Sequence, residues 1–470
     1  MKKKRFFPLS MGIGFLFTGL FCCFSVSADA VEGSPGQTVS GEYAVVINTD
    51  TSSSQNTGTL VFDDGTDTVS SYLSTGSSAA NLPASQILKK ASDTSDYNVL
   101  SSSALSAAAA QSAATSYYIG QEKYIYRSNS TGKTYVCIGI GEHCYIWMDK
   151  DMKASYDAAG KTSSIAKDME GVYDGQPYRI LNTLAGGNIP YEDNSGKISI
   201  LLETLSSASG MYMYDTDITA IHINTPSASA YVSGEMSKRN GLLVHEGQHA
   251  LLWLKTRFSN TGRYMWLNEG LAVTAMDYLW GGIDSSGWLN GIAGSTAIRS
   301  GSSLIYQTYR DDTAQDYGMP YLFMRYVIDR MAGSYKPMDV LPKFYQIDAS
   351  TLTCEEYLTQ VTGIPFKTLM SDFYTAIAAG DLYGNYSFSG DRIAAGKAAT
   401  FPVFSGNSNQ NYTLPAASAV IIKLKNGKFT VPANGSSSII YRIVGNRTTS
   451  AAPSEGSGTA SDPYKITSLD

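Results

Sequence analysis

The chain has 470 residues, of which 43% are hydrophobic and 16% are charged, and its formal net charge at pH 7 is −6. This acidic balance excludes nucleic acid as an expected partner, because binding to phosphate backbones requires clustered basic residues. The length and the apolar content are sufficient for two or three domains with buried cores.

Residues 1–28 have the pattern of a signal peptide for export. A basic start from Lys2 to Arg5 precedes an apolar stretch over 6–24, and small residues that suit cleavage follow at 26–30. We therefore expect an exported protein that is secreted or held at the cell surface or in a periplasm. A membrane anchor over the same residues is the alternative, and no later stretch is apolar enough to span a membrane.

After the signal, residues 31–115 are predicted to form a small β-rich module and a linker. Segments 43–48 and 59–62 have the composition of short strands between turns rich in Ser, Thr and Gly. The low-complexity, Ala-rich stretch over 101–116 indicates a domain boundary near residue 115.

Residues 117–382 are predicted to form one α+β unit, with strands first, helices second and a site in the cleft between the halves. Predicted strands lie at 123–127, 135–140, 144–149, 198–203 and 219–224, with a helix at 163–175 among them. Further helices are predicted at 236–258, from a cap at Asn268 to before Gly281, from Pro320 to Gly333, and from Pro365 to Gly380.

Beyond this unit the pattern returns to strands. The clearest are 419–424 and 438–444, and they predict a C-terminal β-rich module over 385–470. The abundance of Ser, Gly, Tyr and Thr agrees with an exported protein that has much β-structure.

Three cysteines remain after the signal. Cys137 and Cys144 flank a predicted hairpin turn, so a disulfide between two strands is feasible in an oxidising compartment. The alternatives are free thiols or a metal cluster with His143, for which no fourth ligand is evident. Cys354 is expected to be a small buried side chain.

The most informative motif is His245-Glu246-Gly247-Gln248-His249, followed 20 residues after its second histidine by Glu269. On a helix, residues four apart lie about 40° apart, so both imidazoles reach one ion while Glu246 lies about 60° to the side of His249. Only four histidines occur in the chain, and two of them are here. The alternative is a core helix with two histidines that are merely hydrogen-bonded.

This residue set predicts one catalytic zinc ion (Zn2+), held by His245, His249 and Glu269, with a fourth position open to water. Glu246 is then the general base, and the predicted reaction is hydrolysis of peptide bonds in a protein or peptide substrate. Calcium at the acidic turns near 311–316 is a further option, although such residues are more often simply solvated.

A hydrogen-bond donor is also needed for the oxyanion, and no histidine follows His249 in the chain. Tyr317 is the preferred catalytic candidate, just before the third predicted helix. The other tyrosines considered are Tyr321, Tyr309 and Tyr306. Packing at the start of a helix is the alternative role for Tyr317.

These motifs resemble the gluzincin metallopeptidases, with thermolysin-like spacing between His249 and Glu269. Metzincins are excluded, because Leu252 and Lys255 stand where their Gly and third His occur. Three segments over roughly 120–380 resemble the hyicolysin family of secreted bacterial peptidases, namely 141–147 (GEHCYIW), 266–272 (WLNEGLA) and 317–323 (YGMPYLF).

The resemblance implies a thermolysin-like catalytic unit, zinc at the three ligands and Glu246 as the catalytic residue. The chain departs from the thermolysin-like pattern at Val273, where an Asp that braces a zinc histidine is expected; Asp277 is the substitute we consider. We expect a monomeric endopeptidase. The alternatives are an aminopeptidase on the same scaffold and an exported adhesin or carbohydrate-binding protein with a vestigial zinc unit.

Overall fold

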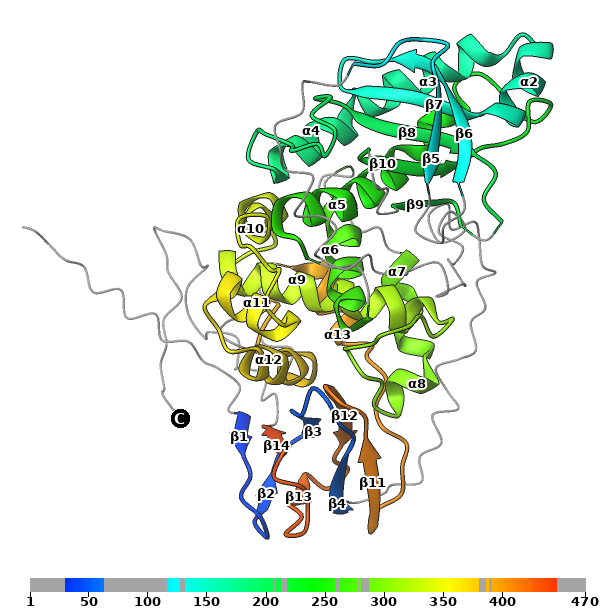
Figure 1. Cartoon of the computed structure of the whole chain (residues 1–470). Helices are drawn as coiled ribbons and strands as arrows, with labels where there is room; N and C mark the ends of the chain where they lie inside the picture. The colour runs from blue at the N-terminus through cyan, green and yellow to red at the C-terminus, as the bar shows by residue number, and fades with distance from the viewer. Residues whose placement is uncertain are drawn as a thin grey trace, which may run out of the picture.

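The structure is a computed structural model, and it describes residues 30–62, 116–126, 132–206, 208–212, 218–258, 262–277, 279, 287–379, 386–388 and 391–445. The predicted signal peptide and the predicted linker over 63–115 lie outside these residues. The described chain forms three units arranged along one long axis: a sheet covered by helices, a central group of helices, and a β-sandwich (Figure 1). The mixture of helices and strands confirms the predicted α+β class.

The first unit is built on a six-stranded sheet, in which β7, β8 and β10 are parallel to one another and the other pairs are antiparallel. In spatial order its strands are β5 (Glu122–Tyr126), β6 (Gly132–Ile140), β7 (Cys144–Asp149), β8 (Ile198–Glu203), β10 (Ala220–Asn224) and β9 (Gly210–Tyr212). Helices α2 (Lys150–Ala158), α3 (Thr162–Tyr173) and α4 (Gln176–Leu184) belong to this unit. All five predicted strands and the predicted helix at 163–175 are confirmed.

The cysteines of this sheet are not joined. Cys137 and Cys144 are both free and buried, and they belong to different hydrophobic clusters: Cys137 packs with Trp147 and Leu201, whereas Cys144 packs with Ile146 and the helices. The two thiols therefore point to opposite faces of the sheet. Of the alternatives that the spacing left open, the structure therefore has the free thiols and not the disulfide, and in the described chain these residues and His143 form no metal cluster.

The central unit contains two deeply buried helices that pack against each other, α5 (Asn240–Thr256) and α6 (Met265–Asp277). Glycines allow close packing: a Cβ on Gly247 would lie 2.4 Å from Leu181 of α4, and one on Gly270 would lie 2.9 Å from the carbonyl oxygen of Pro320. The other helices are α7 (Gly287–Asn290), α8 (Thr296–Arg299), α9 (Met319–Ala332), α10 (Pro337–Phe344), α11 (Cys354–Thr362), α12 (Phe366–Ala379) and α13 (Arg392–Ala398).

Short helical turns precede three of these helices: 3-10 turns at Glu235–Arg239 before α5 and Gly262–Tyr264 before α6, and a π-helical turn at Ala314–Gly318 before α9. The predicted end of the third helix is confirmed, because Gly333 closes α9 with a left-handed φ of 69°. The predicted cap is wrong: α6 begins at Met265, so Asn268 lies inside the helix and not at its start.

The third unit is a β-sandwich of two four-stranded sheets that share one hydrophobic core. One sheet has the order β1 (Ala30–Glu32), β14 (Ile439–Val444), β3 (Tyr43–Asn48) and β12 (Ser418–Lys423); the other has β11 (Gln410–Leu414), β4 (Gln55–Phe62), β13 (Lys428–Thr430) and β2 (Thr38–Ser40). Strands from the two ends of the chain alternate in both sheets. The sequence predicts two flanking β-rich modules, whereas these strands pair into a single sandwich.

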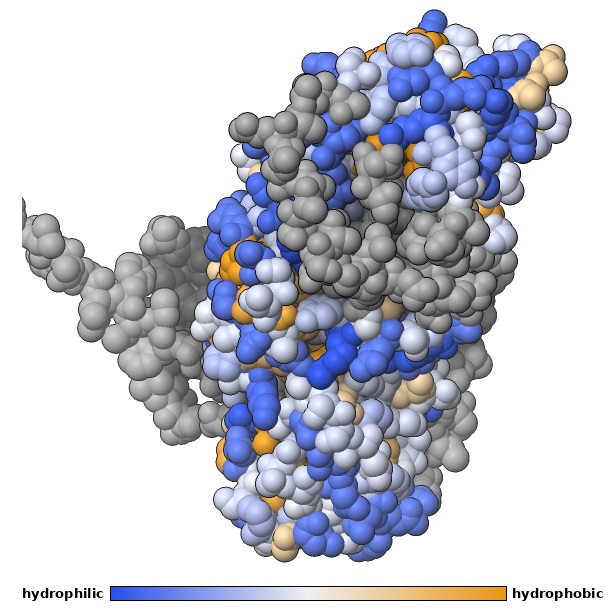
Figure 2. Space-filling model, viewed as in Figure 1, coloured by the Kyte–Doolittle hydropathy of each residue, from blue (hydrophilic) through white to orange (hydrophobic). Residues whose placement is uncertain are grey.

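The sandwich is joined to the helices by a common core. Val45 and Ile47 of β3 and Ile421 of β12 belong to the same hydrophobic cluster as α6, α9 and α12. On the face drawn in Figure 2, polar residues cover most of the described surface, and apolar residues appear in small separate groups. Within the described residues, no helix combines the length and the apolar composition that a membrane span requires.

Candidate metal centre

Two packed helices supply every residue of the predicted metal site. His245, Glu246 and His249 lie in the middle of α5, and Glu269 lies in α6, which packs directly against it. Their side chains are almost fully buried, with exposed fractions between 2% and 4%. Because the histidines are four residues apart on one helix, their rings point to the same side, with ring centroids 4.7 Å apart.

The three predicted ligands converge on one point. One ligand atom from each of His245, His249 and Glu269 lies within 4.8 Å of the others. The carboxylate lies between the rings, with its oxygens 3.2 Å from Nε2 of His245 and 3.6 Å from Nε2 of His249. Among the described residues this is the one cluster of His, Cys, Asp and Glu that could hold a metal ion.

The protonation states favour a cation at this point. Burial lowers the pKa of His249 to about 4, so its imidazole is neutral at physiological pH and its Nε2 lone pair is available. Burial alone raises the pKa of Glu269, but the imidazoles of His249 and His245 outweigh this and hold it below its ordinary value. Burial lowers the pKa of His245, but the hydrogen bond and charge of Glu269 outweigh this and raise it, so a metal ion would take the place of the proton on this ring. Two imidazole nitrogens and one carboxylate oxygen are a donor set that suits zinc better than calcium or magnesium.

Asn268 orients one of the histidines. Its side-chain oxygen lies 2.9 Å from Nδ1 of His249, which leaves Nε2 of that ring for a metal. Asn268 was predicted as a helix cap, so this role was missed, although its position next to Glu269 was the available signal. The substitute we considered, Asp277, instead bonds Arg325 and two tyrosines. Nδ1 of His245 is buried and has no hydrogen-bond partner among the described residues.

Glu246 is buried beside the three donors and is not one of them. Burial raises the pKa of its carboxyl group to about 7; His245 opposes this shift and Glu269 adds to it. The backbone N–H of Tyr212, on the edge strand β9, donates a hydrogen bond to the carboxylate. The group therefore changes its protonation state near neutral pH, as a proton-transfer residue does.

The four candidate tyrosines divide into two pairs. Tyr317 lies with its ring 6.4 Å from that of His245, and it stacks on Tyr309 at 5.9 Å. The hydroxyl of Tyr309 donates to Oε1 of Glu269 at 2.5 Å. The hydroxyl of Tyr306 is buried and donates to the backbone oxygen of Asp316, and that of Tyr321 bonds Asp277. The structure therefore brings Tyr317 and Tyr309 to the cluster.

The acidic turn near 311–316 is occupied by internal contacts. Asp316 accepts from the backbone and the side chain of Arg310, at 2.8 and 2.9 Å. Asp312 accepts from the backbone N–H groups of Ala314 and Gln315. These carboxylates do not form a further candidate metal cluster in the described chain.

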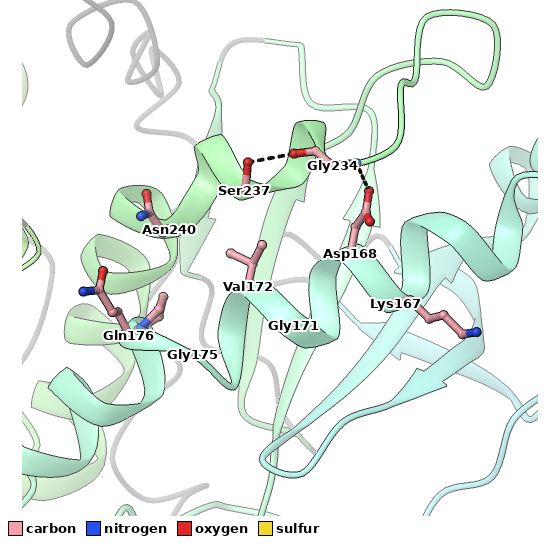
Figure 3. Close-up of a pocket in the computed structure, with 10 residues that line it drawn as sticks. Lys167, Asp168, Gly171, Val172, Gly175, Gln176, Gly234, Ser237 and Asn240 are labelled. Carbon is pink, nitrogen blue, oxygen red and sulfur yellow. Dashed lines mark hydrogen bonds between the residues drawn. The ribbon is translucent and has the colours of Figure 1, made fainter.

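A separate hollow of about 440 Å3 lies on the surface of the sheet unit, near the start of α5. Figure 3 shows that it is lined by side chains of α3, of the start of α4 and of the turn before α5, and that Asp168 and Ser237 bond to the backbone of Gly234. It contains none of the residues of the His–Glu cluster. We therefore do not associate it with the metal centre.

The fold and the site together define an α+β protein with a buried candidate metal centre of two histidines and one glutamate. No protein-family model matches the chain, and no curated protein matches it. Among solved structures, it is similar to the Legionella pneumophila aminopeptidase A in complex with aspartic acid, at 11% sequence identity and a TM-score of 0.30. The match covers 54% of this chain and 27% of that chain, and a likeness of this size assigns neither fold nor function.

Proposed function

We propose that this chain is an exported zinc endopeptidase of gluzincin type, with a thermolysin-like catalytic unit over 117–382 and hyicolysin-like motifs. The convergence of His245, His249 and Glu269 carries the proposal, because it joins three buried donors from two packed helices. Two imidazoles and one carboxylate leave a coordination position for water or substrate, which is typical of catalytic rather than structural sites.

Each residue of the site has a defined task in peptide hydrolysis. When bound, zinc supplies a Lewis acid that polarises the substrate carbonyl and makes water more acidic. Glu246 accepts a proton from the attacking water and passes a proton to the leaving amine. Burial raises the pKa of this carboxyl group above its ordinary value, which favours a residue that both accepts and returns a proton.

Tyr317 is the proposed donor to the oxyanion. Its ring lies beside that of His245, while the hydroxyl of the neighbouring Tyr309 is bonded to Glu269. The two tyrosines thus support different tasks: Tyr309 orients a ligand, and Tyr317 donates to substrate. Replacement of Tyr317 by phenylalanine is expected to lower kcat/KM by more than a few-fold, and a smaller change would remove Tyr317 from the mechanism.

The test compares wild type, Glu246→Gln and Glu142→Gln on a library of N-terminally blocked peptides, with metal analysis of each protein. Glu142 makes a matched control, because its side chain is 80% exposed and receives the same chemical change. Glu246→Gln is expected to retain one zinc ion and to lose at least about a hundredfold in kcat/KM, whereas Glu142→Gln stays active. Equal cleavage by wild type and Glu246→Gln would remove the mechanism.

The same experiment, repeated with the unblocked forms of the peptides, separates the alternatives. An aminopeptidase would cleave free peptides and leave blocked ones intact. An adhesin or carbohydrate-binding protein with a vestigial centre would leave both kinds of peptide intact, with or without bound zinc. Cleavage of blocked peptides at internal bonds would support the endopeptidase.

A further inference from the structure

The segment 301–318, between α8 and α9, carries both tyrosines of the site, and one arginine in it, Arg310, bonds residues near both of its ends. The guanidinium of Arg310 donates to Oδ1 of Asp316 at 2.9 Å and to the backbone oxygen of Gln315 at 2.5 Å. On its other side it donates to the hydroxyl oxygen of Ser302 at 3.0 Å and to the backbone oxygen of Ser303 at 2.8 Å. Arg310 therefore joins the start of the segment to its end.

The outer side of this segment is attached to the β-sandwich. The hydroxyl of Ser303 donates to the backbone oxygen of Ala416 and is shared with that of Ile305 within the segment. The backbone N–H of Leu304 donates to the backbone oxygen of Ala417 at 2.9 Å. Ala416 and Ala417 lie in the turn between β11 and β12. Gly301 packs closely here: its φ is +91°, and a Cβ would lie 2.8 Å from Leu414.

The inner side of the segment reaches the metal centre. Tyr309 immediately precedes Arg310 and donates to Glu269, and its ring stacks on that of Tyr317 at an interplanar angle of 17°. Hydrogen bonds thus link the sandwich to Ser303 and Ser303 to Arg310. The next residue along the chain, Tyr309, bonds Glu269, a proposed metal ligand. A loop without such attachments would be too mobile to hold two hydroxyl groups at a reacting centre.

We propose that Arg310 is a positioning residue, which anchors the 301–318 segment on the β-sandwich so that Tyr309 orients Glu269 and Tyr317 faces the site. This inference rests on the proposed function and extends it, because it makes the sandwich a support of the metal centre. The hydrogen bonds of Arg310 reach none of the three proposed ligands, and it acts through Tyr309, which bonds Glu269. All of its hydrogen bonds given above are to residues within 302–316, and its guanidinium also lies over the ring of Tyr306.

The test uses the full chain with Arg310→Gln, and with Arg263→Gln as a matched control. Arg263 also joins the helices to the sandwich, through Glu355 and the backbone oxygen of Thr51, but it is not part of the 301–318 segment. Arg310→Gln is expected to lower kcat by about tenfold or more at nearly constant KM and to shift the visible absorption of the Co2+-substituted protein. Arg263→Gln is expected to change neither.

Two further measurements decide whether the effect passes through Tyr309. The double variant Arg310→Gln/Tyr309→Phe is expected to lose no more activity than the worse single variant, because both remove one support. Amide hydrogen exchange of the metal-free protein is expected to accelerate in 301–318 for Arg310→Gln and not for Arg263→Gln. Should Arg310→Gln not fold, Ser303→Ala removes the hydrogen bonds of this hydroxyl to Ala416 of the sandwich and to Ile305 of the segment itself. This variant is expected to shift the Co2+ spectrum in the same direction.

An unchanged Co2+ spectrum together with additive losses of activity would overturn the positioning role. Failure of the proposed function looks different, because the wild type would then bind no zinc and cleave no peptide. In that case the exchange measurement decides: acceleration that extends to α6 around Glu269 supports the positioning role, and acceleration confined to 301–318, or none, overturns it.

Discussion

Replacement of Asn268 by leucine removes the hydrogen-bond acceptor that lies 2.9 Å behind His249. Both residues are almost fully buried, so water is not expected to take its place. A buried donor left without a partner costs about 1–3 kcal/mol, and loss of the group behind a metal-bound histidine weakens metal binding by roughly 10- to 100-fold. At about 1.4 kcal/mol for each tenfold change, these two magnitudes agree.

The assay is competition for zinc between the protein and a coloured chelator at neutral pH, with thermal unfolding as the check that the variant is folded. Asn268→Asp is the matched control, because it keeps an oxygen at the same place and a charged acceptor forms a stronger hydrogen bond. The side-chain nitrogen of Asn268 has no partner among the described residues, so its removal sacrifices no hydrogen bond there.

We therefore expect the Asn268→Asp variant to bind zinc at least as tightly as wild type. The Asn268→Leu variant is expected to bind zinc about 10- to 100-fold more weakly. A folded Leu variant with a zinc Kd within twofold of wild type would refute the reasoning. Equal losses in the Leu and Asp variants would also refute it, because they would show that packing and not the acceptor matters.

Three other outcomes are expected. Arg325→Met leaves the buried carboxylates of Asp277 and Asp391 without their cation, and urea denaturation should show a loss of about 3–5 kcal/mol; a loss below about 1 kcal/mol would contradict this. Gly270→Ala places a Cβ against the carbonyl oxygen of Pro320, so thermal unfolding should show about 1–3 kcal/mol of destabilisation, and an unchanged Tm would count against the close packing. Removal of the metal by a chelator should lower Tm, and zinc at a hundred times its Kd should raise the free energy of unfolding by about 2.7 kcal/mol. An unchanged Tm on addition of zinc would argue against a zinc site.

Local patterns were sufficient for the helix that carries the two predicted histidine ligands. The two histidines, four residues apart in an apolar stretch, predict a buried helix, and α5 has this form. Gly333 and the strands over 144–149 and 198–203 were also predicted at their observed positions, because caps and strand composition act over a few residues.

The features that the sequence did not predict are set by contacts between distant parts of the chain. Asparagine is a residue type that favours the N-cap position of a helix. In the structure α6 begins at Met265, and the side-chain oxygen of Asn268 instead lies 2.9 Å from Nδ1 of His249. The spacing of Cys137 and Cys144 does not tell which face of the sheet each occupies. Tyr309 could not be ranked above Tyr321 from sequence, because its place is set by the attachment of its segment to Ala416 and Ala417.

The interleaving of the two chain ends has a consequence for biosynthesis. β3 lies between β14 and β12, and the side chain of Asn48 bonds the backbone oxygen of Leu414, 366 residues further on. Among the described strands, β1 to β4 therefore find no paired partner until residues from 410 onward have been synthesised, so the sandwich cannot form stepwise along the chain. Premature termination before residue 418 would leave β3 without its partners β12 and β14 and would expose the apolar side chains of the helices that pack against the sandwich. Quality-control proteases would be expected to remove such fragments.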